Sequence, residues 1–166
     1  EGALTKALLA TGSNVIAIEK DRDLIEGLEE KFKNYENFTL IQGDIRDLDL
    51  ETLLPKNYKL IANIPYYITG LILRMFLETG AQPSEMILLM QREVADRIIA
   101  SDQKESLLSL SVKVYGHPTK IRNVKAGAFR PIPSVDSAVL QISNISREWF
   151  RNNNVDETRF FTIIRQ

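Results

Sequence analysis

The sequence predicts an α/β fold built on a mostly parallel, doubly wound sheet. Short, nearly continuous apolar runs alternate along the chain with segments whose apolar residues recur at helical spacing. Polar residues stand at the ends of three successive predicted strands, each after an apolar run, namely Glu19, Asp44 and Asn63. Ligands in open α/β sheets bind outside the carboxyl ends of strands, so these residues are placed to form a site. The 166 residues, 44% hydrophobic and 26% charged, suit a globular domain with a sizeable core.

The first part of the chain contains two predicted helices and two predicted strands. Apolar residues at helical spacing predict a helix over 2–11, and Gly12 follows it as a C-cap. The run 14–19 predicts a parallel strand that is buried on both faces. A helix over 23–33 and a strand over 38–41 follow.

The alternation continues through the middle of the chain. Predicted strands and helices follow in the order strand 58–62, helix 69–78, strand 85–90 and helix 92–100. Residues 107–115 are predicted to be helical, although Val112, Val114 and Tyr115 would also suit a strand.

Two late strands are predicted on either side of a proline-containing loop. They cover 121–124 and 138–142, flank the loop 125–137, and suggest an antiparallel edge on the sheet. From Arg147 onward the pattern is helical again. We therefore expect one domain over 1–145 and the start of a C-terminal helical domain over 146–166.

Composition excludes several kinds of site. The chain has no cysteine, so disulfides and thiolate metal sites are excluded. Its one histidine, His117, argues against a histidine metal centre or a Ser-His-Asp triad, and with Pro118 it predicts a loop.

No membrane span or signal peptide is visible, so we expect a soluble, cytoplasmic protein without a metal. The chain lacks an initiator Met and stops in an apolar run, which suggests an internal segment of a longer protein.

Charge is distributed unevenly along the chain. Net charge is −1, yet residues 1–60 carry twelve acidic and eight basic side chains. From Ser106 to Val135 there is no carboxylate. This stretch is a candidate phosphate-facing surface, although a solvated face with a chance gap in acids would look the same. Its basic residues, the candidate RNA contacts, are Lys113, Lys120, Arg122, Lys125 and Arg130.

The motif Asn63-Ile64-Pro65-Tyr66 matches what chemistry on an adenine amino group requires. The Asn63 carbonyl oxygen and a neighbouring main-chain carbonyl, in a turn stiffened by Pro65, would accept hydrogen bonds from the N6 hydrogens. Tyr66 offers a flat face on which an extruded base can stack. A turn without function is the alternative, because Asn and Pro are ordinary turn residues.

Glu19 and Asp44 are candidate cofactor ligands. A carboxylate at the end of the first strand would accept hydrogen bonds from ribose hydroxyls. Asp44 would accept from a cofactor adenine amine, while the Ile45 N–H faces a ring nitrogen. Gly2 would be the last glycine of a loop that approaches the cofactor closely. Each acid alone would also suit a helix cap.

Spaced motifs along essentially the whole chain resemble the small-subunit rRNA adenine N6,N6-dimethyltransferase family. They are Gly2-Ala3-Leu4-Thr5, Glu19, Asp44, Asn63-Ile64-Pro65-Tyr66, the segment 90–97 (MQREVADR) and the segment 129–139 (FRPIPSVDSAV). The resemblance implies a Rossmann-like class I methyltransferase fold that uses S-adenosylmethionine. It places Gly2, Glu19, Lys20, Asp44, Ile45 and Asn63 at the cofactor, and the target base between Tyr66 and Phe129.

The resemblance also implies a substrate and leaves rivals open. Small-subunit rRNA in a pre-ribosomal particle would receive methyl groups at adenine N6, and the enzyme would act as a monomer. The family's first strand and most of its glycine loop have no counterpart here, and Tyr67 stands where Asn is common. An Erm-type large-subunit rRNA methyltransferase, a DNA adenine methyltransferase or a non-catalytic RNA-binding factor are the alternatives.

Overall fold

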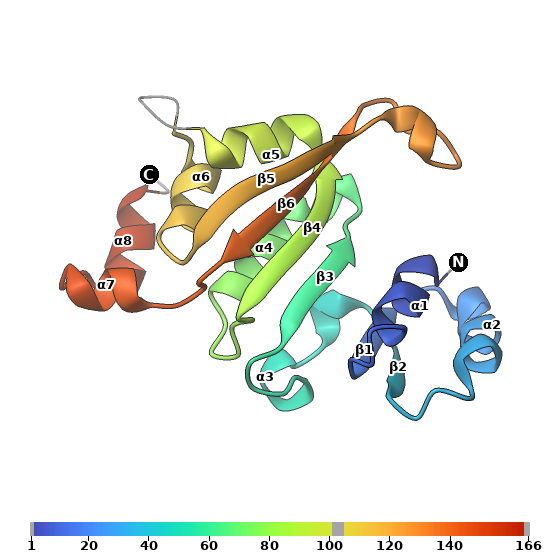
Figure 1. Cartoon of the computed structure of the whole chain (residues 1–166). Helices are drawn as coiled ribbons and strands as arrows, with labels where there is room; N and C mark the ends of the chain where they lie inside the picture. The colour runs from blue at the N-terminus through green and yellow to red at the C-terminus, as the bar shows by residue number, and fades with distance from the viewer. Residues whose placement is uncertain (1, 101–104, 165–166) are drawn as a thin grey trace. The chain divides into compact units, whose positions relative to one another are not determined.

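The computed structural model describes residues 2–100 and 105–164 (Figure 1). The chain divides into two compact units, residues 1–53 and residues 54–166. Each unit has its own parallel strand pairing, as the alternation of apolar runs and helical segments predicts.

The smaller unit is a two-stranded parallel sheet with short helices. The strands β1 (Val15–Glu19) and β2 (Phe38–Gln42) pair in register, with Glu19 opposite Gln42. All four predicted elements are present within a residue or two of their expected bounds. The helices are α1 (Ala3–Leu9), α2 (Arg22–Phe32), the 3-10 turn η1 (Ile45–Asp47) and α3 (Leu50–Leu53).

Burial of β1 differs from the prediction. We expected this strand to be covered on both faces, but none of its residues is fully buried and Ile16 is 38% exposed. The physical reason is that β1 pairs only with β2 within the described residues, so its other edge has no strand beside it. The core of this unit forms instead around Phe32, whose ring contacts Tyr35 and Phe38.

The larger unit contains a four-stranded mixed sheet in the order β3-β4-β6-β5. The strands β3 (Lys59–Asn63) and β4 (Glu85–Gln91) are parallel. The strand β6 (Ser137–Ser143) runs antiparallel to both of its neighbours, β4 and β5 (His117–Val124). The late strand pair therefore forms the antiparallel part of the sheet, as predicted, and β6 lies inside the sheet while β5 forms the edge.

Three helices accompany this sheet and share its core. They are α4 (Thr69–Leu77), α5 (Arg92–Ile99) and α6 (Leu107–Lys113); α6 contacts both α4 and α5, and α5 and α6 contact strands of the sheet (Figure 1). Every second residue of β4 and β6 is fully buried, including Met86, Leu88, Leu140 and Ile142. This period of two shows that one face of the sheet carries the core.

His117 and Pro118 are strand residues, so the predicted loop at this position is wrong. Both belong to β5, where Pro118 lies opposite Ile142 of β6. Proline has no N–H to donate, yet an edge strand tolerates it because one side of the strand has no partner. The β-bulge between Lys120 and Arg122 is a further irregularity of this edge.

The helical pattern after Arg147 is confirmed by α7 (Glu148–Asn152) and α8 (Glu157–Ile164). These helices pack on the larger unit, where Phe150 and Phe161 contact the ring of Tyr115. A domain boundary near residue 145 stays a prediction. Among the described residues, no helix has the length and apolarity that crossing a bilayer requires.

Gly2 occupies a position that only glycine fits. Its φ of 69° lies in the left-handed region, and an added Cβ would stand 2.9 Å from the Phe32 ring. Gly12 has a φ of 79° but nothing within 4 Å of such a Cβ. Gly27, in α2, has neither a positive φ nor a close neighbour.

Alanine at these three glycines should change stability in a graded order. Gly27→Ala should stabilise by about 0.5–1 kcal/mol, because glycine is costly within a helix. Gly12→Ala should destabilise by about 1–2 kcal/mol through the left-handed φ alone. Gly2→Ala should cost more than Gly12→Ala, because the clash with Phe32 adds to the same strain. Thermal unfolding of the three full-length variants measures the order, and equal losses for Gly2→Ala and Gly12→Ala would contradict it.

Candidate active site

In the smaller unit, the residues expected at a cofactor gather at one edge of the sheet. Glu19 ends β1, and its carbonyl accepts a hydrogen bond of 2.9 Å from the Gly43 N–H just after β2. Asp44 follows directly and caps η1. Parallel pairing thus brings Glu19 and Asp44 to the same edge, as the sequence predicts. Glu19 Oε1 accepts from the Asp21 N–H at 2.9 Å, and Oε2 has no partner among the described residues.

Asp44 is held by cations that the sequence reasoning did not assign to it. The Arg46 guanidinium donates to both carboxylate oxygens, and Lys20 Nζ lies 3.0 Å from Oδ2. The Arg46 N–H adds a further hydrogen bond of 3.0 Å. These donors, with Arg46 the largest influence, hold the pKa of Asp44 well below its ordinary value. Asp44 is therefore ionised at neutral pH and already paired.

The other residues of the smaller unit that are expected to bind the cofactor are Lys20, Ile45 and Gly2, and each has a different structural environment. Lys20 is exposed and pairs with Asp44, so in this structure it neutralises an acid. Ile45 is the first residue of η1, a position whose N–H no intrahelical bond uses. Gly2 precedes α1 in the left-handed conformation described above. Lys20, Gly43 and Asp44 also line an open hollow beside α2.

In the larger unit, the sheet register gathers a second group of residues at one edge. Asn63 ends β3 opposite Leu89 of β4, and Leu89 lies opposite Val139 of β6. Since β6 is antiparallel, its first residue, Ser137, lies at the edge where β3 and β4 end (Figure 1). The side chain of Asn63 is exposed and has no hydrogen-bond partner among the described residues.

The turn after Asn63 is fixed by its own main chain. The Ile64 N–H donates to the Leu89 carbonyl at 3.1 Å, and the Ile64 side chain is 3% exposed. The Pro65 carbonyl accepts from the Ile68 N–H at 3.1 Å, and the Tyr66 carbonyl accepts from Thr69 Oγ1 at 3.2 Å. The Ile64 carbonyl has no such partner in the described part of the chain. A free side-chain acceptor and a free main-chain acceptor therefore stand side by side in the sequence.

Tyr66 is held at its far end as well as at its backbone. It begins the 3-10 turn η2 (Tyr66–Ile68), and its hydroxyl lies 2.8 Å from Ser137 Oγ. Ser137 is fully buried. Tyr67, the next residue, is 85% exposed.

The loop 125–136 is anchored at both of its ends by Asp136. One carboxylate oxygen accepts from the Ala126 N–H at 3.1 Å, and the other lies 3.1 Å from Lys125 Nζ and 3.3 Å from Arg92 Nη1. The Ala126 N–H first, and then Lys125, lower the pKa of Asp136. Phe129 lies half-buried within this loop, directly after the 3-10 turn η3 (Ala126–Ala128). No ring contact joins Phe129 to Tyr66 among the described residues.

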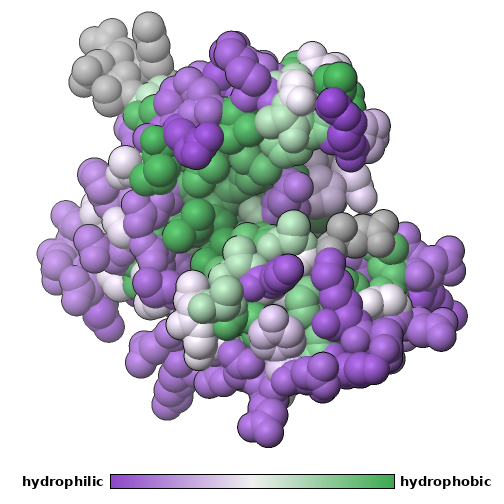
Figure 2. Space-filling model, turned by 45° about the vertical axis from the view of Figure 1, so that its right-hand side comes forward, coloured by the Kyte–Doolittle hydropathy of each residue, from purple (hydrophilic) through white to green (hydrophobic). Residues whose placement is uncertain are grey.

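The five basic residues expected to contact RNA do not form one uniform surface. Three of them pair with acids: Lys113 with Glu105, Lys120 with Asp96 and Lys125 with Asp136. Arg130 donates to carbonyls of its own loop, and Arg122 is exposed on β5. Figure 2 shows one face of the molecule, on which apolar surface lies among hydrophilic side chains. Which of the five meet RNA stays a prediction.

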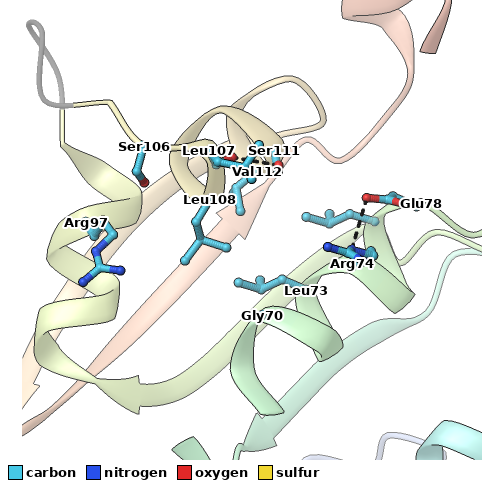
Figure 3. Close-up of a pocket in the computed structure, with 11 residues that line it drawn as sticks. Gly70, Leu73, Arg74, Glu78, Arg97, Ser106, Leu107, Leu108, Ser111 and Val112 are labelled. Atoms are coloured by element: carbon cyan, nitrogen blue, oxygen red, sulfur yellow. Dashed lines mark hydrogen bonds and ion pairs between the residues drawn. The ribbon is translucent and has the colours of Figure 1, made fainter. Parts of the chain in front are cut away.

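An apolar groove lies elsewhere on the larger unit, between α4 and α6 (Figure 3). It measures about 310 Å³, and Leu73, Leu108 and Val112 line it together with polar residues such as Arg74 and Arg97. Arg74 forms an ion pair with Glu78 at its rim, at 3.8 Å. The groove contains none of the residues that the sequence predicts to bind the cofactor, the target base or RNA.

Three contributors to the site were missed from the sequence. Arg46 follows Asp44 by two residues, so its pairing had a local signal that was not used. Ser137 and Arg92 act through partners far along the chain, Tyr66 and Asp136, and no local pattern reveals such contacts.

Comparison with known proteins identifies the family of the chain. The family model for ribosomal RNA adenine dimethylase matches residues 1–166. This chain belongs to that family. Among curated relatives, the ribosomal RNA small subunit methyltransferase A of Dehalococcoides mccartyi strain BAV1 is 44% identical over 99% of the chain and 56% of its own length. The protein of the same name from Fusobacterium nucleatum is 34% identical over 99% of the chain and 62% of its own length.

Solved structures support the class I methyltransferase fold of this family member. A dimethyladenosine transferase from Plasmodium falciparum superposes with a TM-score of 0.83, at 27% identity over 99% of the chain and 58% of its own length. The 23S rRNA methyltransferase ErmE gives a TM-score of 0.81 at 22% identity, over 99% of the chain and 65% of its own length, which shows the shared fold. The chain spans between half and two thirds of the length of these relatives.

Replacing Asp136 by Asn should destabilise the fold at neutral pH, where the carboxylate holds the loop 125–136, but not in acid. Because the folded state lowers the pKa of Asp136, its carboxylate stabilises the fold above the ordinary value of 3.8. That contribution is lost as the pH falls through the lowered pKa. The melting temperature of Asp136→Asn should therefore lie below that of the unaltered protein at neutral pH, and the gap should close in acid.

Asp47→Asn is the matched control for this experiment. Asp47 is exposed, and its side chain accepts no hydrogen bond among the described residues, so its replacement should leave the melting temperature unchanged at every pH. A gap for Asp136→Asn that persists or widens in acid would contradict the assignment.

Proposed function

We propose that the chain carries the catalytic residues of an S-adenosylmethionine-dependent enzyme that methylates adenine N6 in small-subunit rRNA. One observation carries this proposal. Among the described residues, the Asn63 side chain is exposed and has no hydrogen-bond partner at the end of β3, while hydrogen bonds hold the Ile64 N–H and the Pro65 and Tyr66 carbonyls of the turn that follows. An exposed amide on a rigid turn is suited to accept hydrogen bonds from an incoming group.

The motif supplies two acceptors for the two hydrogens of the adenine amine. We assign Asn63 Oδ1 as one acceptor and the Ile64 carbonyl as the other, since the Pro65 and Tyr66 carbonyls are already occupied. Bonds to both hydrogens keep the nitrogen lone pair out of the ring system and point it away from the motif. Holding the amine in this orientation lowers the barrier mainly through positioning. The amine proton becomes acidic only after transfer, so solvent can receive it.

Aromatic side chains would hold the target base. Tyr66 is half-buried and hydrogen-bonded through its hydroxyl, which leaves a ring face for stacking. Phe129 lies in a loop that Asp136 ties to the end of β4 and the start of α5. We propose that Phe129 covers the opposite face of an extruded adenine.

Residues of the smaller unit fit S-adenosylmethionine. Glu19 Oε2 lacks a partner in the described structure and suits a ribose hydroxyl. Asp44 retains its charge, and since Arg46 and Lys20 already occupy its carboxylate, we propose that a cofactor adenine amine displaces the exposed Lys20 when it binds. Gly2, Lys20 and Ile45 complete the proposed cofactor site. When bound, the cofactor supplies an electrophilic methyl group on a sulfonium centre.

The names of relatives support a proposal for the RNA substrate and for the number of methyl groups added. Relatives are named for the ribosomal RNA small subunit or as a dimethyladenosine transferase, which supports two methylations per adenine and rRNA as the substrate. We propose that a pre-ribosomal particle presents this RNA to a monomeric, cytoplasmic enzyme. Lys113, Lys120, Arg122, Lys125 and Arg130 would contact its phosphates.

Asn63→Ala should lower methyl transfer to small-subunit particles by about a hundredfold or more, the scale expected when a transition-state hydrogen bond is lost. Transfer of radiolabelled methyl groups measures the rate, and filter binding measures affinity for RNA, which should persist. Asn152→Ala, an exposed asparagine of α7, is the control and should leave both values unchanged. Near-normal turnover by Asn63→Ala would contradict the assignment.

Glu19→Gln should weaken binding of S-adenosylmethionine about tenfold, because a hydrogen bond to a charged group is stronger than one to a neutral amide. Calorimetric titration of the full-length protein measures the affinity, and Glu36→Gln, at an exposed site, should bind as the unaltered protein does. A protein that binds RNA but ignores the cofactor would instead be a non-catalytic RNA-binding factor.

A further inference from the structure

Buried polar side chains of the chain converge on Tyr66. In the described structure the fully or nearly fully buried polar side chains are Thr69, Ser109 and Ser137. Two of these contact Tyr66: Thr69 Oγ1 donates to its carbonyl at 3.2 Å, and Ser137 Oγ lies 2.8 Å from its hydroxyl. Burying a hydroxyl costs free energy unless it is hydrogen-bonded, so this convergence requires a physical reason.

Ser137 is itself held rigidly. It begins β6 and lies opposite Gln91 at the end of β4 and Val124 at the end of β5. A strand residue paired on both sides has little freedom in its backbone. Its Oγ is therefore a fixed point, set by the sheet, toward which the Tyr66 hydroxyl is directed.

The burial of the two hydroxyls decides which one donates. Ser137 is 0% exposed, and Tyr66 is its one hydrogen-bond partner among the described residues. If Ser137 accepted, its own proton would be buried without a partner, which costs about 1–3 kcal/mol. If Ser137 donates, the remaining proton belongs to Tyr66, which is only partly buried. Ser137 is accordingly the donor.

We propose that Ser137 is a positioning residue for the reaction, because it sets the orientation of the Tyr66 ring on which the target adenine stacks. The inference rests on the proposed function. The turn at Pro65 and Thr69 fixes the backbone of Tyr66, which leaves rotation about two side-chain bonds. A hydrogen bond at the tip of the ring restrains both rotations and so fixes the plane of the ring. A base stacked on that plane is held at a set height and tilt relative to Asn63.

Ser109 shows what a purely structural serine does in this fold. It is also 0% exposed, and its hydroxyl donates to the Ile98 carbonyl at 2.9 Å, within the helical layer. Ser109 and Ser137 thus match in burial and in the number of hydrogen bonds. They differ in that only Ser137 bonds to a residue of the motif, which makes Ser109→Ala the matched control.

The test is a double-mutant cycle in the full-length protein with Ser137→Ala, Tyr66→Phe and the double variant, alongside Ser109→Ala. Ser137→Ala should lower kcat about three- to tenfold, the effect of one net hydrogen bond, and leave KM for the small-subunit particle within about twofold. Adding Ser137→Ala to Tyr66→Phe should cause no further loss, because the bond is already gone. Ser109→Ala should leave kcat unchanged.

Thermal unfolding of the same variants tests the contribution of the bond to stability without any turnover. Tyr66→Phe should melt at a lower temperature than Ser137→Ala, because it leaves the buried Ser137 hydroxyl without an acceptor. A drop in kcat for Ser137→Ala no larger than that for Ser109→Ala, or losses that multiply in the double variant, would overturn the positioning role while methyl transfer by the unaltered protein stands. Absence of transfer by the unaltered protein would overturn the proposed function itself, and the inference with it.

Discussion

The register of the β3, β4 and β6 strands is the constraint on which the candidate active site depends. Asn63, Leu89 and Val139 lie side by side across the three strands, so the residues beyond them share one edge. Tyr66 follows Asn63 by three positions, and Ser137 precedes Val139 by two. Because β6 runs antiparallel to β4, moving forward along the chain from Asn63 and backward along it from Val139 leads to the same end of the sheet. Tyr66 and Ser137 therefore lie at that end. A shift of β6 by one residue would turn Ser137 to the other face of the sheet and break its bond to Tyr66.

Electrostatic interactions organise a loop within each of the two units. Asp44 and Asp136 each follow or precede a strand, each has a lowered pKa, and each is bound by main-chain N–H groups and by cations. Their charges hold η1 and the loop 125–136 in place. Ion pairs also explain why a basic stretch in the sequence is not a basic surface in space: Asp96, Glu105 and Asp136, which all lie outside that stretch in the sequence, pair with its lysines.

Much of the fold was predictable because its strands and helices have strong periodic signals. The expected strands and helices are present, and Asn63 and Glu19 end strands as their positions after apolar runs indicate. The errors arose where context outweighs local pattern. Pro118 lies in a strand because an edge tolerates it, and β1 is less buried than its apolar sequence suggests because it has a single strand neighbour. The Tyr66–Ser137 bond joins residues 71 positions apart, and no local rule predicts it.

We propose that Asn63 and its fixed turn direct methyl groups to adenine N6 in small-subunit rRNA. The most direct measurement is mass spectrometry of nucleosides from small- and large-subunit RNA, each taken from ribosomal particles that lack these methyl groups and incubated with the full-length protein and S-adenosylmethionine. We expect N6,N6-dimethyladenosine in the small-subunit RNA and none in the large-subunit RNA. Methylation confined to the large-subunit RNA, or in neither RNA, would contradict it.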